Sequence, residues 1–157
     1  MKNFKKLLLV LLPILAITVI FSCSSDDDDE MVGPNEKNFK FTVTANNVDE
    51  QDYLSFVFVG SDLNNSNTIW KINGVTQDNE SGVSLGKNDF MGGTKTYVIE
   101  STKPLRLATT GIQCINPGSS NPSFTVSYKA EINGEVVKDD QNIVVKNGSD
   151  YTHNFTY

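Results

Sequence analysis

Histidine, basic residues and long apolar runs are scarce in this 157-residue chain. It has one His, and 13 Lys or Arg against 19 Asp or Glu. One His provides neither a metal-ligand cluster nor a catalytic triad with evident partners. The acidic excess, with a formal net charge of −6, disfavours nucleic acid as a partner. We therefore expect no catalytic residues, no metal site and no dissociable cofactor.

The longest apolar run, Leu7–Phe21, follows Lys2, Lys5 and Lys6 near the N-terminus. As a helix it would reach about 22 Å, less than the roughly 30 Å hydrocarbon core of a membrane. A basic segment followed by a short apolar run predicts a removable export signal over residues 1–22. Cleavage would remove the three lysines and change the formal net charge from −6 to −9.

The apolar run ends in Ile20, Phe21, Ser22 and Cys23. An apolar residue three places before a Cys and a small residue directly before it resemble the lipobox of bacterial lipoproteins. The resemblance implies cleavage between Ser22 and Cys23, with diacylglyceryl and N-acyl lipid on Cys23. Two or three acyl chains anchor a protein stably, at about 0.8 kcal/mol per buried CH₂. The alternative is an unmodified Cys23, buried or disulfide-bonded, in a retained helix.

Residues 23–36 carry six acidic residues and no basic one. Their self-repulsion and poor burial predict an extended tether that can stretch to about 50 Å. An acidic cluster beside a lipidated cysteine also resembles the surface-export signal of Gram-negative lipoproteins, which implies an outer-membrane protein that faces the cell exterior. The periplasmic face, a plain spacer and a weak calcium site are the alternatives. The predicted export signal consists of Ser24, Ser25, Asp26, Asp27, Asp28, Asp29 and Glu30.

Residues 37–157 show the period-2 alternation of strands and no helical period. Phe39–Ala45 and Phe124–Ile132 alternate clearly, whereas Tyr53–Val59 is apolar on both faces, as is typical of a central strand. Asn73-Gly74 and Asn133-Gly134 predict tight hairpins. Further strands are predicted at Thr68–Ile72, Val75–Thr76, Thr96–Ser101, Leu105–Thr109, Ile112–Ile115, Glu135–Lys138, and a pair formed by Ile143–Lys146 and Tyr151–Tyr157 about Asn147-Gly148.

Eight or nine short strands predict an all-β, antiparallel sandwich over residues 37–157. The strand rhythm resembles immunoglobulin-like and fibronectin type III domains, without the antibody disulfide. Once Cys23 is lipidated, Cys114 has no partner within the chain and is expected to pack as a small buried hydrophobe. His153 is expected to be a packed, hydrogen-bonded imidazole. Gly86, Gly92 and Gly93 predict a mobile loop, because their spacing does not match a phosphate-binding loop.

Trp70 and Tyr53 are candidates for an aromatic ligand platform, although the neighbouring Ile72 favours core packing for Trp70. The leading hypothesis is a noncatalytic module that binds an envelope protein or a glycan, or that supports envelope assembly. Glu100 and Glu131 would be the carboxylates of a small glycan-processing hydrolase, if they lie together in a pocket. A third hypothesis is a structural subunit that pairs through strand edges, against which Lys138, Asp139 and Asp140 would guard.

Overall fold

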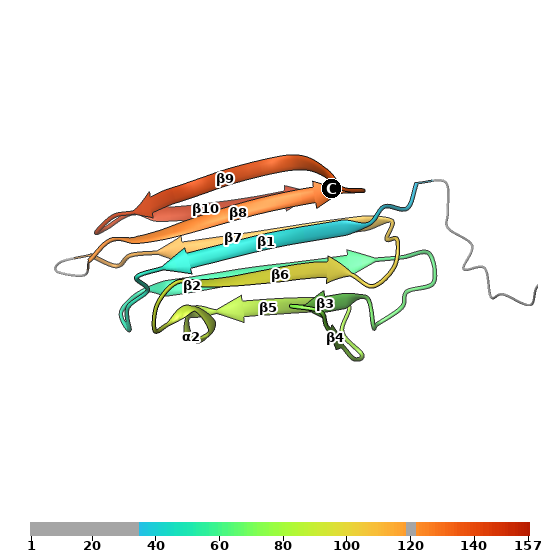
Figure 1. Cartoon of the computed structure of the whole chain (residues 1–157), viewed down its shortest axis with the longest axis horizontal. Helices are drawn as coiled ribbons and strands as arrows, with labels where there is room; N and C mark the ends of the chain where they lie inside the picture. Colours follow the sequence, from blue (N-terminus) through green and yellow to red (C-terminus); the bar gives the residue numbers. More distant parts are fainter. Residues whose placement is uncertain (1–34, 119–121) are drawn as a thin grey trace, which may run out of the picture. The chain divides into compact units, whose positions relative to one another are not determined.

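The computed structural model describes residues 35–118 and 122–157 as a sandwich of two antiparallel sheets (Figure 1). The predicted all-β antiparallel sandwich is thus confirmed. Residues 1–34, which hold the predicted signal, the lipobox and most of the tether, lie outside the described residues. The described elements are β1 (Phe39–Asn46), β2 (Tyr53–Ser61), β3 (Trp70–Ile72), β4 (Val75–Gln77), β5 (Gly82–Gly86), α2 (Lys87–Phe90), β6 (Lys95–Ser101), β7 (Leu107–Ile115), β8 (Phe124–Ile132), β9 (Glu135–Val145) and β10 (Asp150–Thr156).

Six strands form one sheet in the order β4-β3-β6-β1-β8-β9, and four form the other in the order β10-β7-β2-β5. The chain crosses from one sheet to the other between most successive strands, so that sequence neighbours often face each other across the core. Helix α2 has four residues. Within the described residues, no helix has the length and apolar character needed to cross a membrane.

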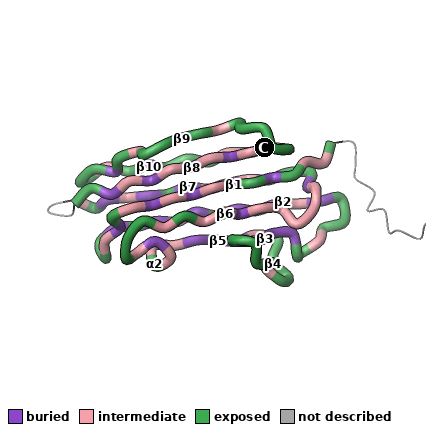
Figure 2. The backbone as a smooth tube through the Cα atoms, viewed as in Figure 1, coloured by how far each residue is buried: buried purple, intermediate pink, exposed green. Residues whose placement is uncertain are grey.

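The core lies between the two sheets and is rich in aromatic rings. Buried and less buried residues alternate along the strands, as Figure 2 shows. Phe41 of β1 is fully buried, and its ring centroid lies 5.1 Å from that of Phe58 and 6.0 Å from that of Trp70. Such pairs add about 0.5–1.5 kcal/mol each beyond the burial of their area. Among the described residues, every buried hydrophobic side chain lies inside one compact unit, which therefore carries its own core.

A chain of hydroxyl groups crosses this core and joins the sheets. Tyr128 of β8 donates to Thr110 of β7 at 3.2 Å, and its hydroxyl lies 3.0 Å from that of Tyr157. Burial raises the pKa of Tyr128 well above its ordinary value. The hydroxyl groups thus satisfy one another where water is excluded, as buried polar groups must be satisfied.

The predicted hairpins are confirmed by their backbone angles. Asn73 and Gly74 join β3 to β4 with φ of 50° and 82°, and Asn133 and Gly134 join β8 to β9 with the same two values. Two positive φ angles in succession define the turn that matches the twist of paired strands.

Two strands that the sequence pattern splits are continuous. β7 runs through Gly111, and β9 runs through the polar stretch Asp139–Asn142. Glycine, Asp and Asn are poor strand formers, but pairing with neighbouring strands overrides that local preference. In β9 two register shifts relative to β8 absorb the irregular sequence as bulges.

The sequence pattern missed β5, and the loop expected at Gly86, Gly92 and Gly93 is confirmed only in part. Gly92 and Gly93 lie between α2 and β6, but Gly86 ends β5 and leads into α2, whose Phe90 is fully buried. A further prediction is wrong. The last strand, β10, pairs with β7 and not with the end of β9. The turn at Gly148 therefore carries the chain from one sheet to the other. This pairing buries Tyr151 between the sheets, which the local turn sequence does not indicate.

Cys114 and His153 end in different environments. Cys114 is fully buried, and burial raises the pKa of its thiol to about 12, which keeps it protonated and unreactive. The prediction of a buried small hydrophobe is confirmed. His153 is exposed and packs on neighbouring rings, with its centroid 4.5 Å from that of Tyr151 and 5.6 Å from that of Phe155. The ring packing expected for His153 is present, but at the rim of the sandwich.

Candidate functional site

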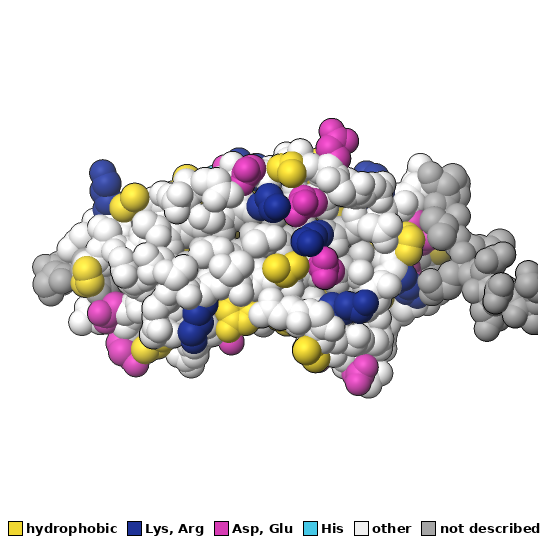
Figure 3. Space-filling model, viewed as in Figure 1, with side chains coloured by type: hydrophobic (Ala, Val, Ile, Leu, Met, Phe, Trp, Pro, Cys, Tyr) yellow, Lys and Arg dark blue, Asp and Glu magenta, His cyan; other side chains and the backbone are white. Residues whose placement is uncertain are grey.

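The outer face of the six-stranded sheet carries a row of alternating charges. The strand registers place Lys71 of β3, Glu100 of β6, Lys40 of β1 and Glu131 of β8 side by side in that order. Lys40 Nζ lies 3.2 Å from Glu100, and Lys129 Nζ lies 2.9 Å from Glu131. Figure 3 shows the resulting mixture of basic and acidic side chains over the centre of this face. We call this row the charge ladder.

The two glutamates of the hydrolase hypothesis line one hollow of about 350 Å³ on this face. They are not adjacent, because Lys40 lies between Glu100 and Glu131 in register. Two strand spacings separate their Cα atoms by about 10 Å. Each carboxylate has an ammonium partner. The arrangement joins the strands electrostatically, and it leaves neither carboxylate without a cation among the described residues.

The outer face of the four-stranded sheet has a different chemistry. Its outward positions hold neutral side chains, and the one acidic residue, Asp150, lies at a corner where β10 begins. We call this surface the neutral face. Its outward residues are Tyr53, Ser55, Val57, Val59 and Ser61 of β2, Ser84 of β5, Leu107, Thr109, Gly111, Gln113 and Ile115 of β7, and Thr152, Asn154 and Thr156 of β10.

The neutral face exposes apolar side chains of the central strand β2. Tyr53 is 50%, Val57 38% and Val59 45% exposed, whereas Leu54, Phe56 and Phe58 on the opposite side of β2 are buried. β2 is central within its sheet, but a two-layer sandwich covers only one face of each sheet. The prediction of a central strand at Tyr53–Val59 is therefore confirmed, although one face of that strand is open.

A second hollow, of about 320 Å³, lies at the centre of the neutral face. Gly111 of β7 forms its floor, with Val57 of β2 and Asn154 of β10 directly beside it in register. Polar side chains from the next row, Ser55, Gln113 and Thr152, also line it, together with Ile112.

The two predicted platform rings are separated by the sandwich. Trp70 is fully buried on the inner side of the six-stranded sheet, where its Nε1 donates to the Ser81 carbonyl at 3.1 Å. Core packing, which Ile72 favoured, is therefore its role, and Trp70 forms no exposed platform. Tyr53 is exposed on the neutral face, two residues along β2 from Ser55 in the hollow.

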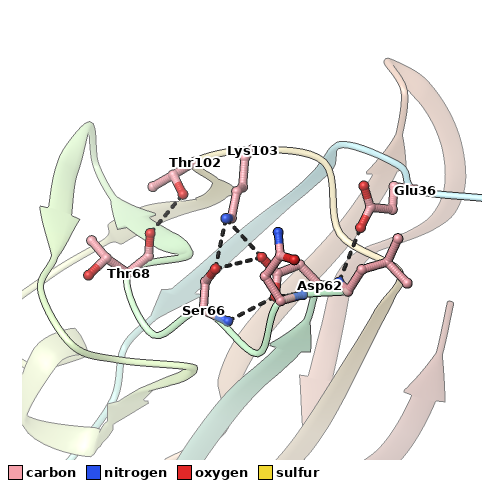
Figure 4. A network of polar contacts seen from close by, with 8 residues as sticks. Glu36, Asp62, Ser66, Thr68, Thr102 and Lys103 are labelled. Atoms are coloured by element: carbon pink, nitrogen blue, oxygen red, sulfur yellow. Dashed lines mark hydrogen bonds and ion pairs between the residues drawn. The ribbon is translucent and has the colours of Figure 1, made fainter. Parts of the chain in front are cut away.

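A network around Asp62 orders the loop between β2 and β3 (Figure 4). The Asp62 carboxylate accepts hydrogen bonds from the Ser66 hydroxyl at 2.7 Å and from the Ser66 and Asn64 backbone amides, and Lys103 Nζ lies 2.8 Å away. Burial alone would raise the pKa of Asp62, but the hydrogen bonds and the charge of Lys103 outweigh it and hold the pKa well below its usual range. These contacts hold the loop between β2 and β3 against Lys103.

A smaller network closes the rim between β9 and β10. The Asp140 carboxylate accepts from Tyr151 at 2.6 Å and from Lys138 at 2.6 Å. Burial raises the pKa of Asp140, but these two bonds outweigh it and lower the pKa below its usual value. β9 is an edge strand, as the charges of Lys138, Asp139 and Asp140 predicted. The bulges and the ion pair blunt this edge against strand pairing.

Among residues 35–118 and 122–157, no group of three or more His, Cys, Asp or Glu side chains is placed to hold a metal ion. Comparison with known protein families finds no match, and no curated protein matches either.

Solved structures with the same fold do match. The calcium-bound form of a protein from Parabacteroides distasonis, determined by NMR, is similar with a TM-score of 0.60 and 15% identity, over 83% of this chain and 99% of that one. A DUF4425 family protein from Bacteroides ovatus gives 0.54 and 16%, and a domain of unknown function, DUF4425, from Bacteroides vulgatus gives 0.57 and 10%. Both alignments cover 78% of this chain and 94% of the other. The likeness concerns the fold.

Proposed function

We propose that this chain is a lipid-anchored, noncatalytic binding module of the outer membrane, facing the cell exterior, whose ligand occupies the neutral face. The sequence Ile20–Cys23 and the acidic run after it support the anchor and its orientation. The binding role depends on one observation, the open neutral face with a hollow at its centre. Exposed apolar groups around a hollow with a few polar groups are typical of ligand sites.

The anchor is tested by changing the proposed lipidated residue. Cys23→Ala should abolish incorporation of a fatty-acid probe and move the protein from the membrane to the soluble fraction, because no acyl chain remains to insert. Ser22→Ala retains a small residue before Cys23 and serves as the matched control. Continued labelling of the Cys23→Ala protein would contradict the anchor.

The exterior location is tested by protease treatment of whole cells. Changing Asp26–Asp29 to Asn should reduce cleavage of the protein on intact cells, because the proposed export signal loses its charge, while membrane association should remain. Unchanged cleavage would contradict an export role for the acidic run and leave it as a spacer.

The binding face is tested with a charge placed on either side of the sandwich. Purified protein spanning residues 24–157 should bind isolated cell envelopes saturably, and Val57→Lys should weaken that binding at least tenfold. Thr42→Lys, on the outer face of β1, should have no such effect. Equal loss in both variants, or in neither, would contradict the assignment of the ligand to the neutral face.

A small glycan-processing hydrolase is the second candidate, because Glu100 and Glu131 line one hollow. Incubation with a panel of envelope and dietary polysaccharides, followed by analysis of released sugars, tests this candidate. Release that disappears in both Glu100→Gln and Glu131→Gln would support hydrolysis, and absence of release would exclude it for that panel.

A further inference from the structure

Two glycines lie in the central strands of the four-stranded sheet, and the fold requires glycine at only one of the two positions. A Cβ atom on Gly60 of β2 would lie 2.8 Å from side-chain atoms of both Leu105 and Trp70, so core packing requires glycine there. A Cβ atom on Gly111 of β7 would meet Asn154 Oδ1 at 3.4 Å, and Gly111 is not among the glycines with positive φ. Neither packing nor backbone conformation therefore requires glycine at position 111.

Glycine in a strand interior weakens the strand, because it has no side chain to pack and loses more entropy on folding than other residues do. Such a glycine often marks a bulge, a tight bend, or a place where a ligand or another backbone approaches closely. The pairing of β7 with β2 and β10 runs through Gly111 without a register shift, so no bulge accounts for it. Gly111 forms the floor of the hollow on the neutral face. The glycine and the hollow thus point to the same site.

We propose, on the basis of the binding role above, that this hollow binds a neutral, polyhydroxylated glycan chain. Four neutral polar side chains surround Gly111: Ser55, Gln113, Thr152 and Asn154. Each can both donate and accept hydrogen bonds, and none has a hydrogen-bond partner among the side-chain bonds of the described residues. Sugar hydroxyl groups have the same dual capacity and match this lining.

The lining disfavours a charged ligand. The neutral face has no basic residue to pair with an acidic sugar or a phosphate, and its one carboxylate, Asp150, lies at the corner of the sheet. A charged group that loses water in the hollow without an opposite charge would bind poorly. The opposite face differs, because its hollow is lined by the charge ladder, whose carboxylates are already paired.

Apolar contacts complete the match to a sugar ring. Val57 lines the hollow, and Tyr53 lies one row beyond Ser55 and Gln113 with half of its side chain exposed. A sugar presents C–H surfaces between its hydroxyl groups, and an aromatic ring with a hydroxyl at its tip can contact both. A chain of several sugars is thereby held by Tyr53 at one end and by the lining of Gly111 at the centre.

The experiment uses purified protein spanning residues 24–157 and isolated envelopes in three forms: untreated, treated with protease, and treated with periodate, which cleaves vicinal diols of sugars. Binding should survive protease and fall at least tenfold after periodate. A panel of immobilised neutral and acidic oligosaccharides should give binding to neutral members only. Gly111→Val and Tyr53→Ala should each weaken that binding at least tenfold, whereas Thr42→Val on the opposite face should leave it unchanged.

The stability of each variant is measured in parallel, because valine is a strong strand former and Gly111→Val should fold at least as well as the parent. Binding to envelopes that depends on the neutral face but is lost after protease and not after periodate would overturn the glycan ligand and leave the proposed function intact. Preference for acidic sugars, or a dimer that Gly111→Val dissociates, would also overturn the proposal. Absence of any binding to envelopes would overturn the proposed function itself.

Discussion

The two outer faces of this sandwich follow the same alternation of strand residues but meet water with opposite chemistries. On the six-stranded sheet, Lys40 and Lys129 each form an ion pair with a glutamate. On the four-stranded sheet, Val57 is exposed, and the polar side chains near it carry neutral hydroxyl and amide groups without ion-pair partners. The charged face thus pairs its ions within the protein, whereas the neutral face leaves apolar and polar groups open to water.

The largest change in the free energy of unfolding is expected when an aromatic ring is removed from the core rather than from the neutral face. Trp70→Ala should lower the free energy of unfolding by about 3–5 kcal/mol, because it removes a fully buried ring and its hydrogen bond to Ser81. Tyr53→Ala should change it by no more than about 0.5 kcal/mol. Urea unfolding followed by fluorescence or circular dichroism measures both, and equal losses would show that the neutral face is part of the core.

Gly60 and Gly111 allow the core and the neutral face to be compared with the same substitution. Gly60→Val should destabilise by about 1–3 kcal/mol, because its Cβ alone approaches Trp70 and Leu105 at 2.8 Å. Gly111→Val should be neutral or stabilising, because strand propensity improves and an added Cβ meets only the Asn154 side chain, at 3.4 Å. Urea midpoints of the two variants measure the difference. A destabilised Gly111→Val protein would show that the fold itself needs this glycine.

The acid dependence of stability tests the two carboxylates with lowered pKa values, Asp62 and Asp140. Asp62 and Asp140 have lowered pKa values, so their contribution to stability is fully present above the unfolded pKa of about 4 and is lost as the pH falls from there through the folded values. The parent protein should therefore lose stability below about pH 4. Asp62→Asn should be less stable at pH 7 and should show a flatter dependence below pH 4. Parallel curves for the two proteins would contradict the role of this carboxylate.

The smallest effect is expected in the charge ladder. Lys40→Met should change the free energy of unfolding by no more than about 1 kcal/mol, because an exposed ion pair with Glu100 is screened by water and salt. The difference from the parent should shrink further at 1 M NaCl, measured by urea unfolding at both salt concentrations. A larger loss that salt does not reduce would show that the ladder contributes more than exposed ion pairs do.

The sequence predicts the sandwich because alternation and Asn-Gly turns are local signals. Phe39–Ala45 and the turns at Asn73 and Asn133 form as expected for that reason. The position of β10 depends instead on which open sheet edge is available to cover Tyr151, which no local pattern states.

The residues of the candidate site could not be recognised as a site from the sequence. The apolar residues on both sides of Tyr53–Val59 are the same whether a second layer covers the strand or a ligand does, and only the fold shows that one side is open. Gly111 is a strand break by propensity, and only its place between Val57 and Asn154 shows it as the floor of a hollow. Trp70, the more conspicuous aromatic residue, is in the core.

The central claim, that the ligand occupies the neutral face, is tested most directly by NMR. Isotope-labelled protein spanning residues 24–157 is titrated with polysaccharide released from the envelope, and backbone amide shifts are followed. The account predicts progressive changes at Gly111, Gln113 and Asn154, with none along the row of Lys40 and Glu100. Changes centred on the charge ladder would contradict it.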